Sequence, residues 1–430
     1  MTSTPDAPDA LLSGEISTGL SAARLPALRR RIQAVLIGTQ ILGGLGIATG
    51  VALAAVLAKD VSGTEAMSGL ASTATVAGPA LLAMPLASLM ARRGRRAGLV
   101  LAYLVGAVGA CVAVLGAVAD SFPLLLLGLV GFGAGSSANL AARFAAADLA
   151  EPDRRARAIS TVVWATTVGA VLGPNIAAPA GESVAGFGIP ATAGPFVWAA
   201  GVFVVAAVMV AVLLRPDPLL TARALAGPEE ATGAAGRSLR AGLTAVREST
   251  RARIALVTVA CSHTAMVSIM SMTPVHLTHH GADIRLIGLV ISGHIAGMYA
   301  FSPLMGWLAD RLGRLSVIGL AVALIATAAL LAGTAGPSHG QTALGLFVLG
   351  LGWSAGLVSG SALLTDSVPQ AARAAVQGLS DTIMNTAAGL GGLVAGLIVS
   401  QVGYGWLNVV GACLLVPMTL LVLRGAVRRA

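Results

Sequence analysis

The chain has 430 residues, of which 56% are hydrophobic and 10% are charged, and its mean hydropathy is +0.86. Soluble domains carry about 25% charged residues, so this composition excludes a cytosolic enzyme and a disordered protein, neither of which keeps so much apolar surface from aggregating. The three cysteines exclude a secreted protein built on disulfides, and a membrane protein with many spans remains.

Apolar runs long enough to cross a bilayer recur along the chain. A spanning helix needs about 20 mostly apolar residues, whereas barrel strands would alternate over about ten. The runs here are continuous, so we predict an all-α membrane protein. The twelve predicted spans cover residues 32–58, 67–91, 97–119, 121–147, 157–180, 194–214, 253–276, 284–309, 314–335, 339–365, 374–401 and 403–423.

The basic residues predict the orientation. Of the 27 Lys and Arg residues, 24 fall before the first span, after the last, or in connections on one side. Lys59 and Arg285 lie on the other side, and Arg143 lies within the fourth span, near enough to its end to extend toward the membrane surface. Positive charge marks the cytoplasmic side, so both termini are expected in the cytoplasm of a multi-pass plasma (inner) membrane protein. The basic surplus then requires no nucleic-acid partner.

The predicted spans divide into two sets of six. The segment between them contains three prolines and several arginines, which is typical of a linker. A weak repeat, offset by about 218 residues, relates the two sets, as in transporters built from two bundles. The predicted parts are a cytoplasmic tail (1–31), an N-terminal six-helix bundle (32–214), a cytoplasmic linker (215–252), a C-terminal six-helix bundle (253–423) and a cytoplasmic tail (424–430). The first tail lacks the features of a signal peptide, so the first span is expected to remain as an anchor.

The connection after the eighth span contains a motif with the pattern G-x-x-x-D-R-x-G-R. Its residues, called here the gate motif, are Gly306, Asp310, Arg311, Gly313 and Arg314. Gly306 permits close helix approach, and Asp310 with two arginines makes a charge cluster that can form in one state and break in another. The N-terminal copy, residues 87–96, lacks the glycine and the aspartate. We expect a weaker contact there, unless its arginines serve only to set the topology.

This motif and the topology resemble the major facilitator superfamily over the whole chain. The resemblance implies two six-helix bundles, a site between them at mid-membrane, and alternating access. It also implies a transporter without a cofactor rather than an enzyme, and the sequence contains no nucleophile–base set or phosphate-binding loop. A non-transporting receptor on the same fold is a further alternative, although a receptor has no need of a gate motif.

The fifth span contains Gly169, Gly173 and Pro174, which resemble the G-x-x-x-G-P pattern of antiporter members. Such glycines let two helix backbones touch, and the proline is expected to bend the helix. Plain close packing explains the pattern as well as a coupling role does.

Two sulfur and imidazole pairs suggest a substrate. Met266 and Met270 are one helical turn apart in the seventh span, and His294 and Met298 are one turn apart in the eighth, both near mid-membrane. Thioethers with an imidazole suit Cu(I). The pairs resemble those of CcoA-like copper importers, which implies copper as a transported substrate. Methionine also commonly fills cores, so a different substrate is equally compatible with these residues.

Four further histidines are candidates for metal capture. His276, His279 and His280 are expected in the outer loop after the seventh span, where they either collect a metal or lie in solvent. His263 either extends the metal site or bonds a backbone carbonyl.

Asp381 is the candidate for proton coupling, because ionisable residues within spans are commonly functional. A structural hydrogen bond near the helix end is the alternative. Together these residues favour a monomeric transporter with the bilayer and a solute or metal ion as partners, most simply a copper importer. A proton-coupled transporter of a small organic molecule, for uptake or efflux, is the alternative.

Overall fold

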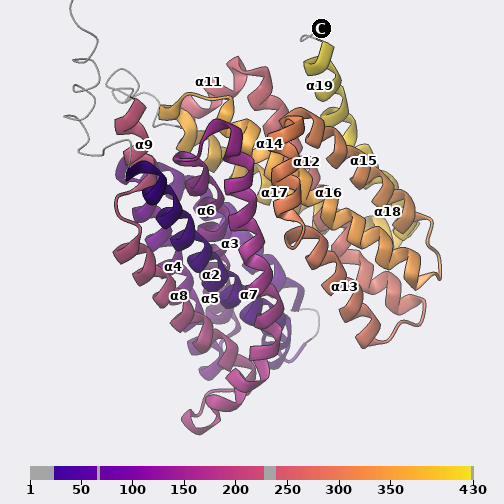
Figure 1. Cartoon of the computed structure of the whole chain (residues 1–430). Helices are drawn as coiled ribbons and strands as arrows, with labels where there is room; N and C mark the ends of the chain where they lie inside the picture. The colour runs from indigo at the N-terminus through magenta and orange to yellow at the C-terminus, as the bar shows by residue number, and fades with distance from the viewer. Residues whose placement is uncertain (1–23, 65–67, 227–238, 428–430) are drawn as a thin grey trace, which may run out of the picture.

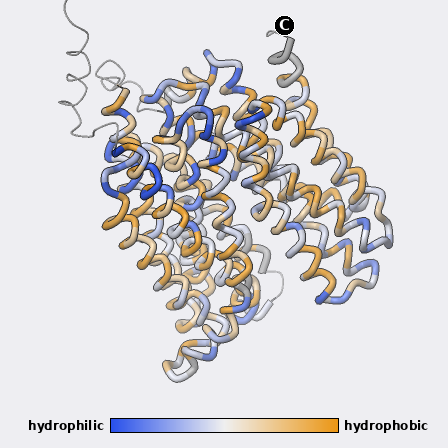
Figure 2. Tube along the Cα trace, in the orientation of Figure 1, coloured by the Kyte–Doolittle hydropathy of each residue, from blue (hydrophilic) through white to orange (hydrophobic). Residues whose placement is uncertain are grey.

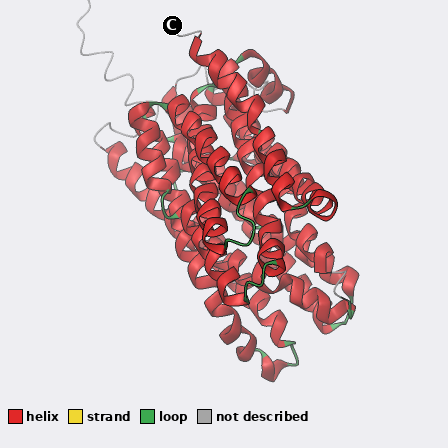
Figure 3. Ribbon diagram, turned by 90° about the vertical axis from the view of Figure 1, so that its right-hand side faces the viewer, coloured by secondary structure: helices red, strands yellow, loops and turns green. Residues whose placement is uncertain are grey.

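The computed structural model describes residues 24–64, 68–226 and 239–427. The predicted tails therefore lie partly outside the described residues (1–23 and 428–430), as does the middle of the predicted linker (227–238). Within the described ranges all regular structure is helical (Figure 3), and twelve helical segments are long and apolar enough to cross a membrane. The predictions of an all-α fold and twelve spans are confirmed.

Indigo-to-magenta helices form one half of the molecule and orange-to-yellow helices form the other (Figure 1). The helices of the first half are α2 (Leu25–Ser62), α3 (Ser68–Arg93), α4 (Arg95–Val118), α5 (Phe122–Ala134), α6 (Ser136–Asp148), α7 (Arg155–Ser183) and α8 (Gly194–Leu213). Those of the second half are α12 (Thr250–His279), α13 (Ile284–Tyr299), α14 (Ser302–Leu312), α15 (Arg314–Gly333), α16 (His339–Asp366), α17 (Arg373–Val402), α18 (Tyr404–Cys413) and α19 (Leu415–Val427).

Three predicted spans are each divided into two helices. The fourth divides at Gly135, the eighth at Ala300 and Phe301, and the twelfth at Leu414. The eighth span divides where Pro303 enters the first turn of α14, because a proline has no N–H to continue the hydrogen bonds of the preceding helix. The first helix begins at Leu25, earlier than predicted, because Pro26 in its first turn favours a helix start.

The predicted linker also contains helices. These are α9 (Pro218–Ala226) and α11 (Leu239–Glu248), which lie at the upper end of the molecule in Figure 1. The apolar side of α11 packs on the start of α17, where an added Cβ on Gly242 would lie 3.3 Å from Ala375. The end of the molecule formed by α9, α11 and the α3–α4, α6–α7 and α14–α15 connections is called the arginine-rich end below.

Each half has its own apolar core. One buried cluster extends from Leu28 to Ala222, and the other joins residues of the second half with several from α6 and α7. The outer surfaces of both halves are largely hydrophobic (Figure 2), as expected of helices that face lipid. The two halves meet where α3 packs on α17 and where α7 packs on α13 and α14.

Candidate functional site

A cavity of about 230 Å3 lies between the two halves. Residues of α2, α3, α5 and α6 form one wall, and residues of α12 and α17 form the other. The lining residues are Ile47, Val51, Thr75, Val76, Pro79, Gly133, Ser136, His263, Val267, Asn385 and Ala388. None of the described lining residues has a carboxylate or guanidinium group, so this lining is mostly apolar with a few hydrogen-bonding groups.

His263 is held in this cavity by Trp353. The indole Nε1–H of Trp353 donates to His263 Nδ1 over 2.8 Å, and the Trp353 side chain is buried edge-on against Tyr299. Indole nitrogen is a donor only, so His263 Nδ1 accepts, and the neutral ring has its proton on Nε2. His263 Nδ1 is therefore occupied by Trp353 rather than by a metal or a backbone carbonyl, and a metal contact through Nε2 stays a prediction.

An ion pair joins the halves beside the cavity. Arg143 Nη2 lies 2.5 Å from Asp381 Oδ1, and both side chains are buried. Arg143 Nε also donates to Ser361 Oγ over 3.2 Å. The expectation that Arg143 extends to the membrane surface was wrong, because its guanidinium turns toward the opposite half, where Asp381 supplies the countercharge. Asn385 lies one turn beyond and donates through Nδ2 to Asp381 O over 2.7 Å.

Toward the arginine-rich end, the space between the halves closes. α3 and α17 approach so closely that an added Cβ on Gly378 would lie 2.1 Å from Ala87 Cβ. The remaining cavity has a volume of about 20 Å3 and is lined in part by Arg95, Gln377 and Asp381. This space holds about one water molecule, so a solute in the central cavity has no path to this end.

The N-terminal motif copy contributes to this closure through Arg95. Arg95 is buried and pairs with Asp148 over 2.7 Å within its own half, while its Nη2 donates to Gln377 in the other. The position of the missing aspartate, Ala91, is buried against Leu219 of α9 and Ala374 of α17. The sequence predicted a contact at this motif copy but not the partners of Arg95, which are Asp148 and Gln377.

The gate motif forms a second contact between the halves. Asp310 accepts hydrogen bonds from the backbone N–H groups of Ala156 and Arg157 at the start of α7, over 3.1 and 2.9 Å. Arg314 lies 2.6 Å from Asp310 and also contacts Asp366, which pairs with Arg155. This arrangement joins a carboxylate to the positive end of a helix dipole.

Three other residues of the gate motif have separate roles. Gly306 lies against α7, where an added Cβ would be 2.1 Å from Ser160 Oγ. Gly313 has a φ of +92°, which favours glycine between α14 and α15. The Arg311 guanidinium lies over the ring of Trp307 at 5.1 Å rather than beside Asp310. The expected charge cluster thus has Arg314 and residues of the first half as the partners of Asp310.

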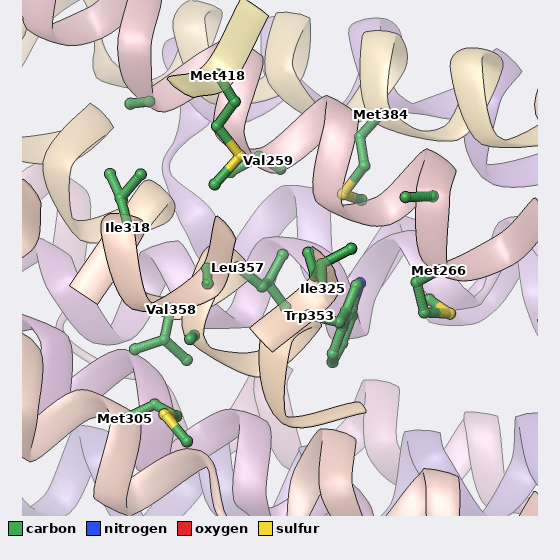
Figure 4. Close-up of a cluster of buried hydrophobic side chains, with 14 of the residues drawn as sticks. Val259, Met266, Met305, Ile318, Ile325, Trp353, Leu357, Val358, Met384 and Met418 are labelled. Carbon is green, nitrogen blue, oxygen red and sulfur yellow. The ribbon is translucent and has the colours of Figure 1, made fainter. Parts of the chain in front are cut away.

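The two sulfur and imidazole pairs lie on α12, which packs on α17 and α16, and on α13, which packs chiefly on α16; α12 and α13 meet each other little. His294 is buried, and its Nδ1–H donates to Leu346 O over 2.7 Å. Its buried Nε2 has no hydrogen-bond partner among the described residues. Met298 is also buried on α13. Met266 belongs to the apolar cluster of the second half with Trp353 and Ile325 (Figure 4), and Met270 packs against that cluster.

His276 and His279 lie in the last turn of α12 rather than in the predicted loop, and His280 follows directly after the helix. His276 stacks on Tyr404 with ring centroids 4.3 Å apart, and its ring lies 4.4 Å from that of His280. His280 Nδ1 donates to His276 O over 2.9 Å, and His279 is exposed. Among the residues the structure describes, no three or more His, Cys, Asp or Glu side chains form a group suited to a metal.

Gly169 and Gly173 lie where α7 packs on α2. An added Cβ on Gly169 would lie 2.4 Å from Leu45 N, and one on Gly173 would lie 2.5 Å from Ala48 Cβ. The two backbones therefore touch in the first half. The side chain of Pro174 is outside the described part of the structure.

The sequence profile of the Major Facilitator Superfamily matches residues 35–282 and 255–429. The chain belongs to the major facilitator superfamily. Superfamily membership makes it a multi-pass membrane transporter without a cofactor and not an enzyme, as predicted.

Relatives in the superfamily cover nearly the whole chain. It is 37% identical to YdeG of Bacillus subtilis, an uncharacterised MFS-type transporter, over 93% of both chains. It is 30% identical to the riboflavin transporter RfnT of Brucella anthropi, over 78% of this chain and 82% of that one. Among solved structures, the proton:xylose symporter XylE matches with a TM-score of 0.72 at 14% identity, over 93% and 95% of the two chains, which shows the shared fold.

Proposed function

We propose that this protein moves a small uncharged organic solute across the plasma membrane by alternating access, acting as a monomer. The observation that carries the proposal is the cavity between the two halves, which is closed toward the arginine-rich end by buried polar contacts. The distribution of arginine favours that end as the cytoplasmic one. The described conformation would then be the one that receives solute from outside.

The cavity lining supports an uncharged solute. The ionised pair nearest to it, Arg143 and Asp381, is already matched, so neither charge is available to balance an ionic substrate. A charged solute would need an opposite charge to offset its desolvation, and the lining supplies hydroxyl, amide and imidazole groups instead. The relative named as a riboflavin transporter makes riboflavin the first probe.

Asp381 is the proposed proton carrier. Protonation would neutralise its carboxylate and remove the countercharge of Arg143, which weakens the contact between α6 and α17. Opening of the arginine-rich end would then be linked to proton binding. The alternative, a purely structural ion pair, predicts transport that does not depend on this residue's protonation.

Uptake of radiolabelled riboflavin into liposomes containing the full chain tests the proposal. We expect uptake above that of empty liposomes, and we expect Val76→Trp to abolish it by filling the cavity. Val108→Trp is the matched control, because Val108 is exposed on the outer surface of α4. Uptake that survives Val76→Trp would place the solute path elsewhere, and no uptake of riboflavin or of other uncharged heterocycles would contradict the proposed substrate class.

Copper import is the second candidate. It is favoured by His294, whose Nδ1–H donates to Leu346 O and whose buried Nε2 meets no hydrogen-bonding group in the part of the chain that the structure describes. Met298 lies one helical turn further along α13. A metal-binding histidine commonly has its second nitrogen held in this way. The limited contact between α12 and α13 weighs against a site shared by all four ligands.

Uptake of radiolabelled copper under reducing conditions distinguishes the candidates. Copper import requires His294→Ala and Met298→Ala to lower copper uptake at equal expression, and Met266→Ala and Met270→Ala to do so if all four residues bind. Equal copper uptake by all four variants and the unaltered chain would remove this candidate.

A further inference from the structure

We infer that His263 and Asn385 together bind the solute by an edge that carries a carbonyl beside an N–H, as in a lactam or imide. This inference rests on the proposed function and names the substrate class for the same cavity. It follows from the two polar side chains that the second half contributes to the lining and from the partners that already occupy part of each.

His263 presents a donor of fixed position. Its Nδ1 accepts from Trp353 Nε1, so the remaining ring nitrogen, Nε2, has the proton and is available to a ligand. Trp353 is buried and is itself packed against Tyr299, which restricts the ring that positions His263. Trp353 is thus a positioning residue, and the imidazole offers an N–H to an acceptor atom such as a carbonyl oxygen.

Asn385 presents an acceptor. Its Nδ2 donates to the backbone oxygen of Asp381, which leaves Oδ1 to accept from a ligand N–H. α12 and α17 run side by side, with Gly391 in contact with Thr264 and Ser268. Because Asn385 lies less than two turns before Gly391, the packing brings Asn385 close to the level of His263. One wall therefore offers a donor and an acceptor together.

The opposite wall has a different character. Ile47, Val51, Val76 and Pro79 make most of that side apolar. Its two hydroxyl residues are Thr75 and Ser136, and the Ser136 hydroxyl already donates to Gly133 O over 2.7 Å. An apolar face opposite a donor–acceptor pair suits a flat ring system whose body packs on the first half and whose polar edge bonds the second. Uncharged heterocycles with a lactam or imide edge, including the flavin ring and simpler pyrimidinediones, have this shape and this polarity.

A cavity of this kind discriminates by hydrogen bonding. A buried donor or acceptor of the protein loses its hydrogen bond to water when a ligand binds. If the ligand offers no hydrogen bond in return, binding weakens by about 10-fold to 100-fold. Methylation of the ligand N–H removes the donor that Asn385 requires and adds bulk at the same point. The ratio of affinities for the parent and the N-methylated compound therefore measures this contact.

The test uses riboflavin and 3-methylriboflavin, with equilibrium binding to the purified full chain in lipid nanodiscs. We expect the unaltered protein to bind riboflavin at least about 10-fold more tightly than the methylated compound. Asn385→Val should bring the ratio close to one. His263→Phe, which keeps an aromatic ring, should weaken riboflavin binding by about 10-fold, and His263→Gln should restore part of it because an amide can accept from Trp353 and donate to the ligand.

Trp353→Phe tests the positioning role separately. Without the indole donor the imidazole can change tautomer, so riboflavin binding should weaken while binding of a solute that contacts only the apolar wall stays unchanged. Melting temperatures of all variants show whether each one folds. The conservative His263→Gln keeps the inference testable if His263→Phe fails to fold.

The outcomes separate this inference from the function on which it rests. If both flavins bind equally well, if Asn385→Val leaves the affinity ratio unchanged, or if His263→Phe binds riboflavin as tightly as the unaltered protein, the lactam-edge inference is overturned and the proposed transport of an uncharged solute remains. If neither riboflavin nor uracil, hypoxanthine or lumichrome binds, both proposals are overturned.

Discussion

Arg143 and Asp381 form a buried ion pair between α6 and α17, with Arg143 Nη2 2.5 Å from Asp381 Oδ1. The two residues belong to different halves of the molecule. A charge pair that is removed from water is held together only while both members stay ionised. This pair therefore links the protonation of one carboxylate to the contact between the halves.

Asp381→Asn should remove the pH dependence of transport. The asparagine resembles the protonated carboxyl, so the variant should open its arginine-rich end more often and should transport at a rate that no longer changes with pH. Counterflow in liposomes at several pH values measures this. Asp153→Asn is the control, since Asp153 is an exposed carboxylate of the α6–α7 connection. A pH profile that Asp381→Asn leaves unaltered would exclude Asp381 as the proton carrier.

Removal of one member of the pair should destabilise the protein more than removal of both. Asp381→Leu alone would leave Arg143 buried without a countercharge, at a cost of about 3–5 kcal/mol. The double variant Arg143→Leu/Asp381→Leu replaces the pair by apolar groups and should recover most of that loss. Thermal unfolding in detergent measures the difference. A double variant that is less stable than either single one would mean that the pair stabilises the fold through its other contacts, such as Ser361.

The twelve spans could be predicted from the sequence, whereas the ion pair of Arg143 and Asp381 could not. A helix that crosses the bilayer needs a continuous apolar run, so local sequence is enough to locate each of the twelve spans. Arg143 was misjudged because its partner is distant in the chain, and only the packed helices bring them together. Trp353 was likewise missed, because the contact with His263 depends on how α12 and α16 face each other. The division of the eighth span, by contrast, had a local signal in Pro303.

Asp310→Ala should destabilise the closed arginine-rich end. Asp310 accepts from two backbone N–H groups at the start of α7, in the manner of a helix cap supplied by the other half. Loss of such a cap costs about 0.5–2 kcal/mol, which would shift the balance of states toward the conformation open at this end. Thiol labelling of a cysteine introduced at Ala141, in the small closed cavity, measures that shift. Arg311→Gln is the control, because Arg311 contacts Trp307 instead. Equal labelling in both variants would contradict a gating role for Asp310.

Leu219→Ser should open the same end through the first half. Leu219 is fully buried in α9 between Ala91 of α3 and Ala374 of α17, and so occupies the place where the N-terminal motif copy lacks an aspartate. Arg223 of the same helix donates to Ala91 O over 2.7 Å, which fixes α9 to the end of α3. The apolar contact with Ala374 is lost when α17 moves away from α3, so it stabilises the closed state alone. It contributes part of the about 1.5–3 kcal/mol of a fully buried leucine, since the contact with Ala91 remains.

Leu220→Ser is the matched control for this helix, because Leu220 is 43% exposed. Thiol labelling at position 141 should rise with Leu219→Ser and stay near its original level with Leu220→Ser. If the cysteine at position 141 is labelled at the original rate in both variants, α9 does not contribute to closure. The contact of Arg95 with Gln377 would then keep the arginine-rich end closed without α9. If both label faster, α9 acts through its general folding rather than through the contact between Leu219 and Ala374.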